Sequence, residues 1–592
     1  MKMKMMLILF LILSFFRVET VWSGVPDQWM WGNPQYHEHD GKNHVFYNHN
    51  WQNEGWLRGN TDLINKLGSE KVPEKLMIKV VFSIKDCKHE DWQAIAVVGM
   101  VRSQKRIRPF FVHCCVDQEY SERLDTIMMP NSSVAVLDSI NEQLRGKYDF
   151  LGSAIAIDEA YPGAGMEDRR KFVLEFLEEK IGSALQSGEE PVVFSTVLSY
   201  NAEGTLELMA SLKEKFGPKV RTGIGGQLVR ISPETYAALP FIDQVGVGDA
   251  EAILEPLLIG KKSFINGYWQ ISPSQNYAPP SYDHYLGLGE RLDEMGRFKF
   301  GPFSGFRQLA VESVRGCSWA HSVKRACEMC SLQSVTSSPI FRSFPEYFAL
   351  ENQLAEKFGI NWIFDVSNQF IPVMGAERQE QWLRDFLEAR KKHSGYDINK
   401  YVYLTSNSIS ERTAPLLREA GIRLPYIGFD GWNVSTRKAL NKPQSDPRNV
   451  LRLLKENGMY ARLGLVIGSG LSQNDLRELP EFAESIINEF KGTILTWGNF
   501  LEIILPGSRV WYELEEKALA NNWKEVIGLY SFFYQNGYLT WPQQERMTEL
   551  YIRLVQKTDY AEVVASRDRA IEIINPHTVS ITFRTGGRLE KA

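Results

Sequence analysis

Short apolar runs of strand length alternate with longer runs of helical periodicity between residues 309 and 520. The strand-length runs are Leu309–Val314, Asn361–Val366, Tyr401–Thr405, Pro425–Phe429, Arg462–Ile467 and Phe500–Leu505. Helical spacing follows at Pro345–Phe358, Glu377–His393, Ser410–Ala420, Pro447–Asn457, Gln473–Glu489 and Trp511–Ala520. Regular strand–helix alternation predicts a parallel sheet covered by helices. Because eight units are needed for a closed barrel, these six predict an open, partial (β/α)6 barrel over residues 305–520.

A second alternation of this kind lies earlier in the chain. Its predicted strands are Phe150–Ile157, Pro191–Ser195, Arg221–Ile224 and Gln244–Val247. Its predicted helices are Glu167–Gln186, Gly204–Lys215, Pro233–Ala238 and Ala250–Leu258. The pattern predicts an open, doubly wound, Rossmann-like α/β unit over residues 146–262. No G-x-G-x-x-G sequence opens this unit, which argues against a dinucleotide ligand.

Four further segments complete the predicted organisation. Residues 25–145 lead into the first α/β unit, and residues 263–304 form a proline-containing linker. The C-terminal extension, residues 521–592, contains a predicted helix near Pro542–Gln556 and a predicted strand near Val579–Phe583. The fourth segment is the N-terminal one, residues 1–24, in which lysines precede an apolar run at 5–16.

This N-terminal run has the pattern of a secretory signal and is too short to span a bilayer comfortably. Three interpretations stay open: a cytoplasmic protein, membrane association through residues 5–16, and export. The chain has 67 basic and 72 acidic residues, and its net charge is −5. No block of like charge is present, so nothing favours a nucleic-acid partner. Six cysteines in 592 residues are too few for a disulfide framework.

Three of these cysteines lie on one predicted loop, directly after the first strand of the barrel. Cys317, Cys327 and Cys330 have the spacing C-x9-C-x2-C. Ligands of α/β folds bind at the carboxyl ends of strands. Three thiolates there suit a [4Fe–4S] cluster, and a fourth iron without a cysteine ligand would stay open to a substrate or cofactor. A structural zinc site that also uses His321 is the alternative.

The run RGCSW…CEMCSL, followed by six strand–helix units, resembles the radical S-adenosylmethionine (SAM) enzymes. Their usual spacing is C-x3-C-x2-C, and the longer first gap is closer to the cobalamin-dependent methyltransferases that modify ribosomal peptides. Three downstream segments resemble the fourth, fifth and sixth strands of this family: Gly428–Asp430 with Lys442, Gly464–Gly468, and Leu505–Ser508. A gap of nine residues departs from the family pattern, although a longer loop costs little closure entropy.

The segment GIGGQLVRISPETYAALPFIDQVGVGDAEAIL resembles the cobalamin-binding domain that precedes such barrels. Glycines at strand ends allow the backbone to approach a ligand closely. The resemblance implies that cobalamin contacts the strand-end residues Ser195, Thr196, Gly225, Gly226, Gln227, Gly248 and Asp249. The D-x-H-x-x-G sequence that supplies a histidine to cobalt in other cobalamin proteins is absent. Water or a residue near Leu198–Tyr200 would then face the lower side of cobalt.

The resemblance also implies the remaining site residues. Cys317, Cys327 and Cys330 would hold the cluster, and Met329 would lie against the adenine of SAM. Further contacts to SAM would come from residues at the end of the second strand and after the third and fourth strands: Asp365, Asn368, Ser406, Asn407 and Asp430. The cofactors implied are a [4Fe–4S] cluster, SAM and cobalamin, and an external one-electron reductant would supply the electron.

The activity implied is methyl transfer to an unactivated carbon of a small molecule or of a peptide natural-product precursor. Three alternatives remain at this stage. The first is a non-methylating rearrangement or cyclisation by a cobalamin-dependent radical SAM enzyme. The second is a radical SAM enzyme whose N-terminal α/β unit is only a scaffold. The third is a non-catalytic zinc or iron–sulfur binding protein.

Overall fold

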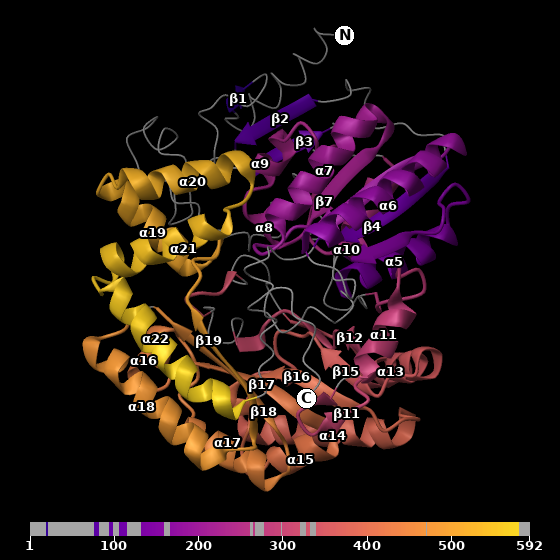
Figure 1. The fold of residues 1–592 in the computed structure, drawn as a ribbon. Coiled ribbons are helices and arrows are strands. Elements are labelled where there is room, and N and C mark those ends of the chain that lie inside the picture. Colours follow the sequence, from indigo (N-terminus) through magenta and orange to yellow (C-terminus); the bar gives the residue numbers. More distant parts are fainter. Residues whose placement is uncertain are drawn as a thin grey trace.

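The computed structural model describes residues 19–21, 76–81, 94–98, 106–114, 132–158, 166–260, 264–266, 278–297, 299–319, 327–331, 339–468 and 470–578. The apolar run at 5–16, His321 and the predicted strand at 579–583 lie outside the described residues. Two α/β units form the body of the structure, one above the other in Figure 1, and the C-terminal helices run along one side of both. None of the helices in the described part of the chain combines the length and apolar character needed to cross a membrane.

The N-terminal unit is a six-stranded sheet of order β5-β4-β6-β7-β8-β9, parallel at every pairing. Its strands are β4 (Ile107–His113), β5 (Ile155–Asp158), β6 (Glu190–Thr196), β7 (Arg221–Gly225), β8 (Gln244–Val247) and β9 (Phe264–Asn266). Its helices are α5 (Ser132–Arg145), α6 (Met166–Gln186), α7 (Ala202–Phe216), α8 (Gln227–Ile231), α9 (Pro233–Ala238) and α10 (Ala250–Leu258). The parallel sheet agrees with the sequence analysis.

Apolar side chains of β4 alternate between the two faces of this sheet. Phe111 packs with α5 and α10 on one face, whereas Phe110 and Val112 pack with α6 and α7 on the other. Helices on both faces are the arrangement of a doubly wound sheet. The unit extends beyond the predicted range of residues 146–262, because β4, α5 and β9 also belong to it.

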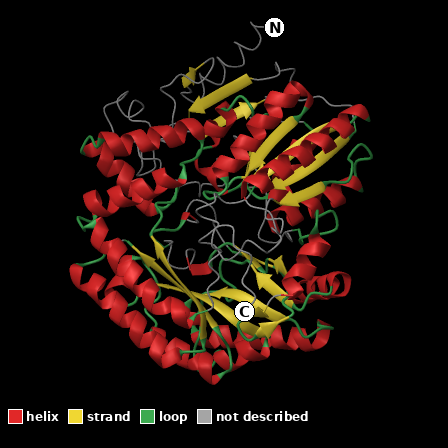
Figure 2. Cartoon of the chain, viewed as in Figure 1, coloured by secondary structure: helices red, strands yellow, loops and turns green. Residues whose placement is uncertain are grey.

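The C-terminal unit is a second parallel sheet, of order β12-β15-β16-β17-β18-β19. Its strands are β12 (Gln308–Val311), β15 (Trp362–Asp365), β16 (Asn399–Leu404), β17 (Ile422–Asp430), β18 (Ala461–Ile467) and β19 (Ile494–Leu501). Its helices are α13 (Phe344–Phe358), α14 (Ala376–His393), α15 (Ala414–Glu419), α16 (Val434–Ala439), α17 (Pro447–Glu456) and α18 (Gln473–Phe490), which lie outside the sheet in Figure 2. Six strands in chain order agree with the predicted alternation. The sixth strand begins earlier than predicted, at Ile494 rather than Phe500.

Side-chain alternation separates the two faces of this sheet as well. Trp362 and Phe364 of β15 pack with Tyr401 in an aromatic cluster on one face. Ile363, between them, packs with the helices on the other face. Such alternation follows from the twofold period of a strand, and it decides which polar residues at the strand ends can face a ligand.

The predicted linker and the C-terminal extension are more ordered than the sequence indicated. Residues 278–297 lie against the edge of the first sheet, where Leu286 N donates to Ala156 O (2.9 Å), and continue into α11 (Leu288–Arg297). The extension contains α20 (Lys524–Asn536), α21 (Trp541–Leu550) and α22 (Tyr560–Ile574), after α19 (Arg509–Ala520). Thr235 Oγ1 of the N-terminal unit donates to Tyr534 O (2.9 Å), whereas α22 packs on α18. The extension therefore holds the two units together.

Candidate cluster and cofactor site

The loop that carries the three cysteines, residues 316–339, is closed at its base by a short antiparallel pair. Strand β13 (Val314–Arg315) pairs with β14 (Ile340–Phe341) on the two sides of the loop. Beneath the pair, Ser367 Oγ accepts hydrogen bonds from Val314 N (2.7 Å) and Ser313 N (2.9 Å). We call residues 316–339 the cysteine loop; the structure describes 316–319, 327–331 and 339.

Two thiols of the cysteine loop, those of Cys327 and Cys330, lie near the ammonium group of Lys442, and Cys317 lies near Cys327. Burial raises the pKa of the Cys327 thiol, while the nearby Lys442 charge opposes that rise and Cys317 adds to it. Burial disfavours the charge on Lys442, but the Asp430 carboxylate and the thiols of Cys327 and Cys330 together raise its pKa well above its usual value. The cysteines separated by nine residues in the sequence are therefore brought to a common place.

The buried Asp430 and the half-buried Lys442 form an ion pair beside these thiols. Asp430 has φ 56°, a left-handed conformation that costs a non-glycine residue about 1 kcal/mol. It also lies at an irregularity in the pairing of β17 with β18, between Gly428 and Asp430. Strained backbone of this kind persists only where the surroundings impose it, and it is concentrated at functional sites.

A chain of hydrogen bonds runs from the cysteine loop across the ends of β15 and β16. Ser318 Oγ donates to Gln369 Oε1 (3.0 Å), and Gln369 Nε2 donates to Thr405 Oγ1 (2.8 Å). Thr405 Oγ1 in turn lies 2.5 Å from Asn407 Oδ1. Of these residues the sequence analysis named only Asn407. Their position directly after strands was the available signal for the other three.

The remaining residues predicted to bind SAM differ in their surroundings. Asp365 follows Ile363 by two positions and so points to the helix side of the sheet. It is fully buried and accepts from Ser313 N (3.3 Å) and Ser367 N (3.1 Å), so it supports the base of the cysteine loop. The contact of Asp365 with the amino group of SAM stays a prediction. Three others stay candidates: Met329 is half-buried, Asn368 is exposed, and Ser406 is buried on the turn after β16.

In the N-terminal unit, the chain order reverses between β4 and β6, which are neighbours in the sheet. Ligands of open α/β sheets bind at this switch point, outside the carboxyl ends of the strands. Thr196 ends β6 there, and its Oγ1 lies 3.1 Å from Ser133 Oγ of α5. Ser195, one residue earlier, is buried and donates to Val112 O (2.7 Å). Ser195 thus ties β6 to β4, and the contacts of Ser195 and Thr196 with cobalamin stay predictions.

His113, which the sequence analysis did not single out, ends β4 at the same switch point. Burial lowers the pKa of His113, against the opposing charge of Asp158. The imidazole is therefore neutral near pH 7. Its Nδ1 lies 3.4 Å from Asn201 Nδ2, and the ring of Tyr200 lies edge-on at 6.3 Å. The predicted turn at Leu198–Tyr200 lies beside a buried histidine.

Two predicted cobalamin residues contact the C-terminal unit directly. Asp249, after β8, lies 3.4 Å from Arg315 Nη1, two residues before Cys317. Gln227, at the start of α8, donates through Nε2 to Ser331 Oγ, one residue after Cys330. The glycines Gly225, Gly226 and Gly248 lie at the same strand ends, and the last two have φ angles of 107° and 125°. The strand-end turns that carry Gln227 and Asp249 therefore face the cysteine loop.

The spacing of the thiols helps to distinguish a cluster from a single ion. Among the described residues, the only His, Cys, Asp or Glu ligand atoms grouped within 4.8 Å of one another are those of Asp138, Glu142 and His284. Tetrahedral zinc with bonds of about 2.3 Å would hold two sulfurs roughly 3.8 Å apart. A four-iron cluster is larger, because each cysteine binds a different iron. At least one sulfur–sulfur distance among Cys317, Cys327 and Cys330 therefore exceeds 4.8 Å, and His321, the further ligand of the zinc alternative, lies outside the described residues.

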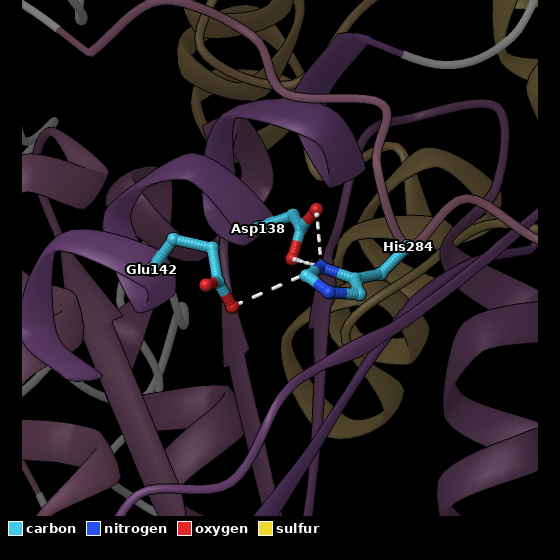
Figure 3. Close-up of side chains that lie close together, drawn as sticks. All are labelled: Asp138, Glu142 and His284. Carbon is cyan, nitrogen blue, oxygen red and sulfur yellow. Dashed lines mark hydrogen bonds and ion pairs between the residues drawn. The ribbon is translucent and has the colours of Figure 1, made fainter.

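The group that does meet this criterion is Asp138, Glu142 and His284 (Figure 3). His284 Nδ1 lies 3.0 Å from Asp138 Oδ1 and 3.8 Å from Glu142 Oε1. Arg145 already donates to both oxygens of Glu142 (2.9 and 2.7 Å). The group joins residues 278–297 to α5 and has internal partners for its charges.

No protein-family model and no curated protein matches the chain. Among solved structures, the chain is similar to cobalamin-dependent radical SAM enzymes. One is the radical S-adenosylmethionine methyltransferase TsrM from Kitasatospora setae, solved with cobalamin and a [4Fe–4S] cluster: 14% identity, 70% of this chain, 75% of that chain and TM-score 0.47. Another is the cobalamin-dependent S-adenosylmethionine radical enzyme OxsB, with aqua-cobalamin and S-adenosylmethionine: 14% identity, 87% of this chain, 75% of that chain and TM-score 0.49.

Proposed function

We propose that this chain is a cobalamin-dependent radical SAM enzyme that transfers a methyl group to an unactivated carbon of a small-molecule or peptide substrate. The observation that carries the proposal is that Cys317 lies near Cys327, and that Cys327 and Cys330 lie near Lys442. This grouping occurs at the carboxyl ends of a parallel sheet and faces the strand-end turns of a second α/β unit.

The residues of the cysteine loop fit a [4Fe–4S] cluster. Three thiolates are soft ligands of the kind that such clusters require. A cluster held by three thiolates carries negative charge, and the half-buried Lys442 ammonium supplies an opposite charge beside Cys327 and Cys330. A bound cluster, once reduced by an external one-electron reductant, would supply the electron for reductive cleavage of SAM.

SAM would bind between the cysteine loop and the ends of β15 to β17. Met329 would contact the adenine, and the exposed Asn368 is available for the amino group. Ser406 and Asn407 follow β16 on one turn, where Thr405 holds the side chain of Asn407 through Oδ1. Asp430 would form a hydrogen bond to SAM and, at the same time, an ion pair with Lys442. These residues orient the cofactor and exclude water, which is the protein's part in such reactions.

Cobalamin would bind at the carboxyl ends of β4, β6, β7 and β8, where it would supply the methyl group. At the turn after β7, Gly226 packs against the backbone of Val197, and a side chain there would collide with it. Its Cβ would lie 2.7 Å from Val197 N and 2.7 Å from Val197 O. Thr196, Gly225 and Gly248 line the same edge of the sheet. Gln227 and Asp249 would border the ligand while they contact the C-terminal unit.

Anaerobic reconstitution with iron and sulfide tests the proposal. The reconstituted protein should bind about four irons with matching sulfide, and SAM plus a reductant should yield 5′-deoxyadenosine. Alanine at Cys317, Cys327 or Cys330 should abolish iron binding. Alanine at the buried Cys114, which directly follows β4 in the N-terminal unit, should leave iron binding intact. Zinc without iron, or an intact cluster that never cleaves SAM, would overturn the assignment.

Methyl transfer has its own test. With hydroxocobalamin and SAM present, a candidate substrate should gain one CH2 in mass. A product of rearranged connectivity and unchanged carbon count would instead favour the non-methylating reaction.

A further inference from the structure

The cysteine loop is contacted by the N-terminal unit at both of its ends. At the first end, Arg315 Nη1 lies 2.9 Å from Glu251 Oε2 and 3.4 Å from Asp249 Oδ1. At the other end, Ser331 Oγ accepts from Gln227 Nε2. Arg315 precedes Cys317 by two residues and Ser331 follows Cys330 directly, so both contacts act close to a cysteine.

Arg315 carries one positive charge among three partly buried carboxylates. Besides Asp249 and Glu251, Glu312 Oε2 lies 3.0 Å from Arg315 Nε. The side chains of all four residues are between 17% and 26% exposed. Interactions between charges at this depth are screened less than those at the surface. A shift of any one carboxylate therefore changes the field at Arg315, and with it the field beside Cys317.

Asp249 links this ion cluster to the proposed corrinoid site. It follows Gly248, whose φ of 125° forms the turn at the end of β8, and it is the residue before α10. A corrinoid that contacts this turn would share Asp249 with Arg315. Corrinoid binding in the N-terminal unit would thus change the electrostatic field at Arg315, two residues before Cys317.

We propose that Arg315 is a positioning residue that couples corrinoid binding in the N-terminal unit to the cluster on the cysteine loop. The inference rests on the proposed function, since it assumes both cofactors. Coupling between two binding sites is reciprocal. Corrinoid binding therefore shifts the reduction potential of the cluster, and the oxidation state of the cluster shifts the affinity for corrinoid.

The chain offers a matched control in Arg509. Arg509 Nε lies 3.4 Å from Glu328 Oε2, and Glu328 stands between Cys327 and Cys330. Both Arg509 and Glu328 follow the linker and lie on the C-terminal side of the site. Replacing Arg509 by glutamine thus removes a positive charge close to the cysteines and leaves Arg315, Ser331 and their partners in the N-terminal unit unaltered.

The experiment uses the full chain, reconstituted with iron and sulfide. Redox titration followed by electron paramagnetic resonance gives the cluster potential with and without hydroxocobalamin, and visible absorption gives corrinoid affinity with oxidised and reduced cluster. The natural protein should show a potential shift and a change in affinity of about fivefold or more. R315Q should lose both, R315K should keep them in part, and R509Q should keep them in full.

The outcomes separate the inference from the function on which it rests. If the natural protein binds no cluster or no hydroxocobalamin, the proposed function fails. If it binds both but shows no shift, or if R315Q shifts as the natural protein does, only the coupling fails. Loss of coupling in R509Q as well would mean a general effect of charge and would also refute the role of Arg315. Should R315Q not fold by circular dichroism, the double variant D249N/E251Q must lose the coupling instead.

Discussion

Alanine in place of Gly226 is a sharp test of the turn at the carboxyl end of β7. Gly226 has φ 107° and ψ −174°, a region essentially restricted to glycine that costs other residues about 1–3 kcal/mol. The added Cβ would lie 2.7 Å from Val197 N and from Val197 O, and overpacking against atoms that cannot rotate away costs about 1–3 kcal/mol more. We therefore expect G226A to lower the free energy of unfolding by about 2–6 kcal/mol.

The same substitution should weaken corrinoid binding, because the displaced backbone belongs to the proposed site. Val197 N donates to Gly225 O (2.7 Å) and Leu228 N donates to Val197 O (3.2 Å), so the ends of β6 and β7 move together. Urea unfolding and a hydroxocobalamin titration by visible absorption measure the two effects. Gly182, in α6 with open space around its Cβ position, is the control, and G182A should gain about 0.5–1 kcal/mol. A G226A protein that keeps the natural stability would refute the steric reasoning, and one that is destabilised yet binds hydroxocobalamin normally would remove the turn from the site.

Two further substitutions test buried charges. Burial raises the pKa of Glu515 well above its usual value, against a hydrogen bond from the Tyr534 hydroxyl (3.4 Å). The folded chain thus keeps a proton that the unfolded chain releases, so stability falls as the pH rises from the usual carboxyl pKa to the raised one. Between these two pH values, E515Q should remove a slope of about 1.4 kcal/mol per pH unit from the free energy of unfolding in urea. Parallel plots of this free energy against pH for the two proteins would contradict the reasoning. K400M should cost about 3–5 kcal/mol, because it leaves the fully buried Glu351, 2.6 Å from Lys400, without its charge partner. K400M/E351L should recover most of that loss by the same assay, and a double variant no more stable than K400M would argue against the ion pair as the cause.

Local periodicity was enough to place most of the C-terminal sheet. Strands such as Arg462–Ile467 differ from the observed β18 (Ala461–Ile467) by one residue, because each has a short apolar run bounded by polar turns. The sixth strand was placed too late, since its register is set by pairing with β18, where Ala461 lies opposite Ile494. β4 was overlooked as part of the first sheet. It contains Pro109, which argues against a central strand, but the ladder of β4 with β5 begins only at Phe110.

The amino-acid sequence by itself determined the two strand–helix alternations and the spacing of three cysteines after a strand. Both are local patterns: hydrophobic period reports which face of an element is buried, and residue spacing reports what one loop can hold. Only the tertiary structure decided which polar residues meet. Asp365 points to the helix side of the sheet because of the twofold period of β15. Lys442, which follows β17 in the chain, lies near the thiols of Cys327 and Cys330. Arg315 contacts Asp249 across a separation of 66 residues. Contacts between distant segments depend on how two sheets pack, and no local pattern encodes that packing.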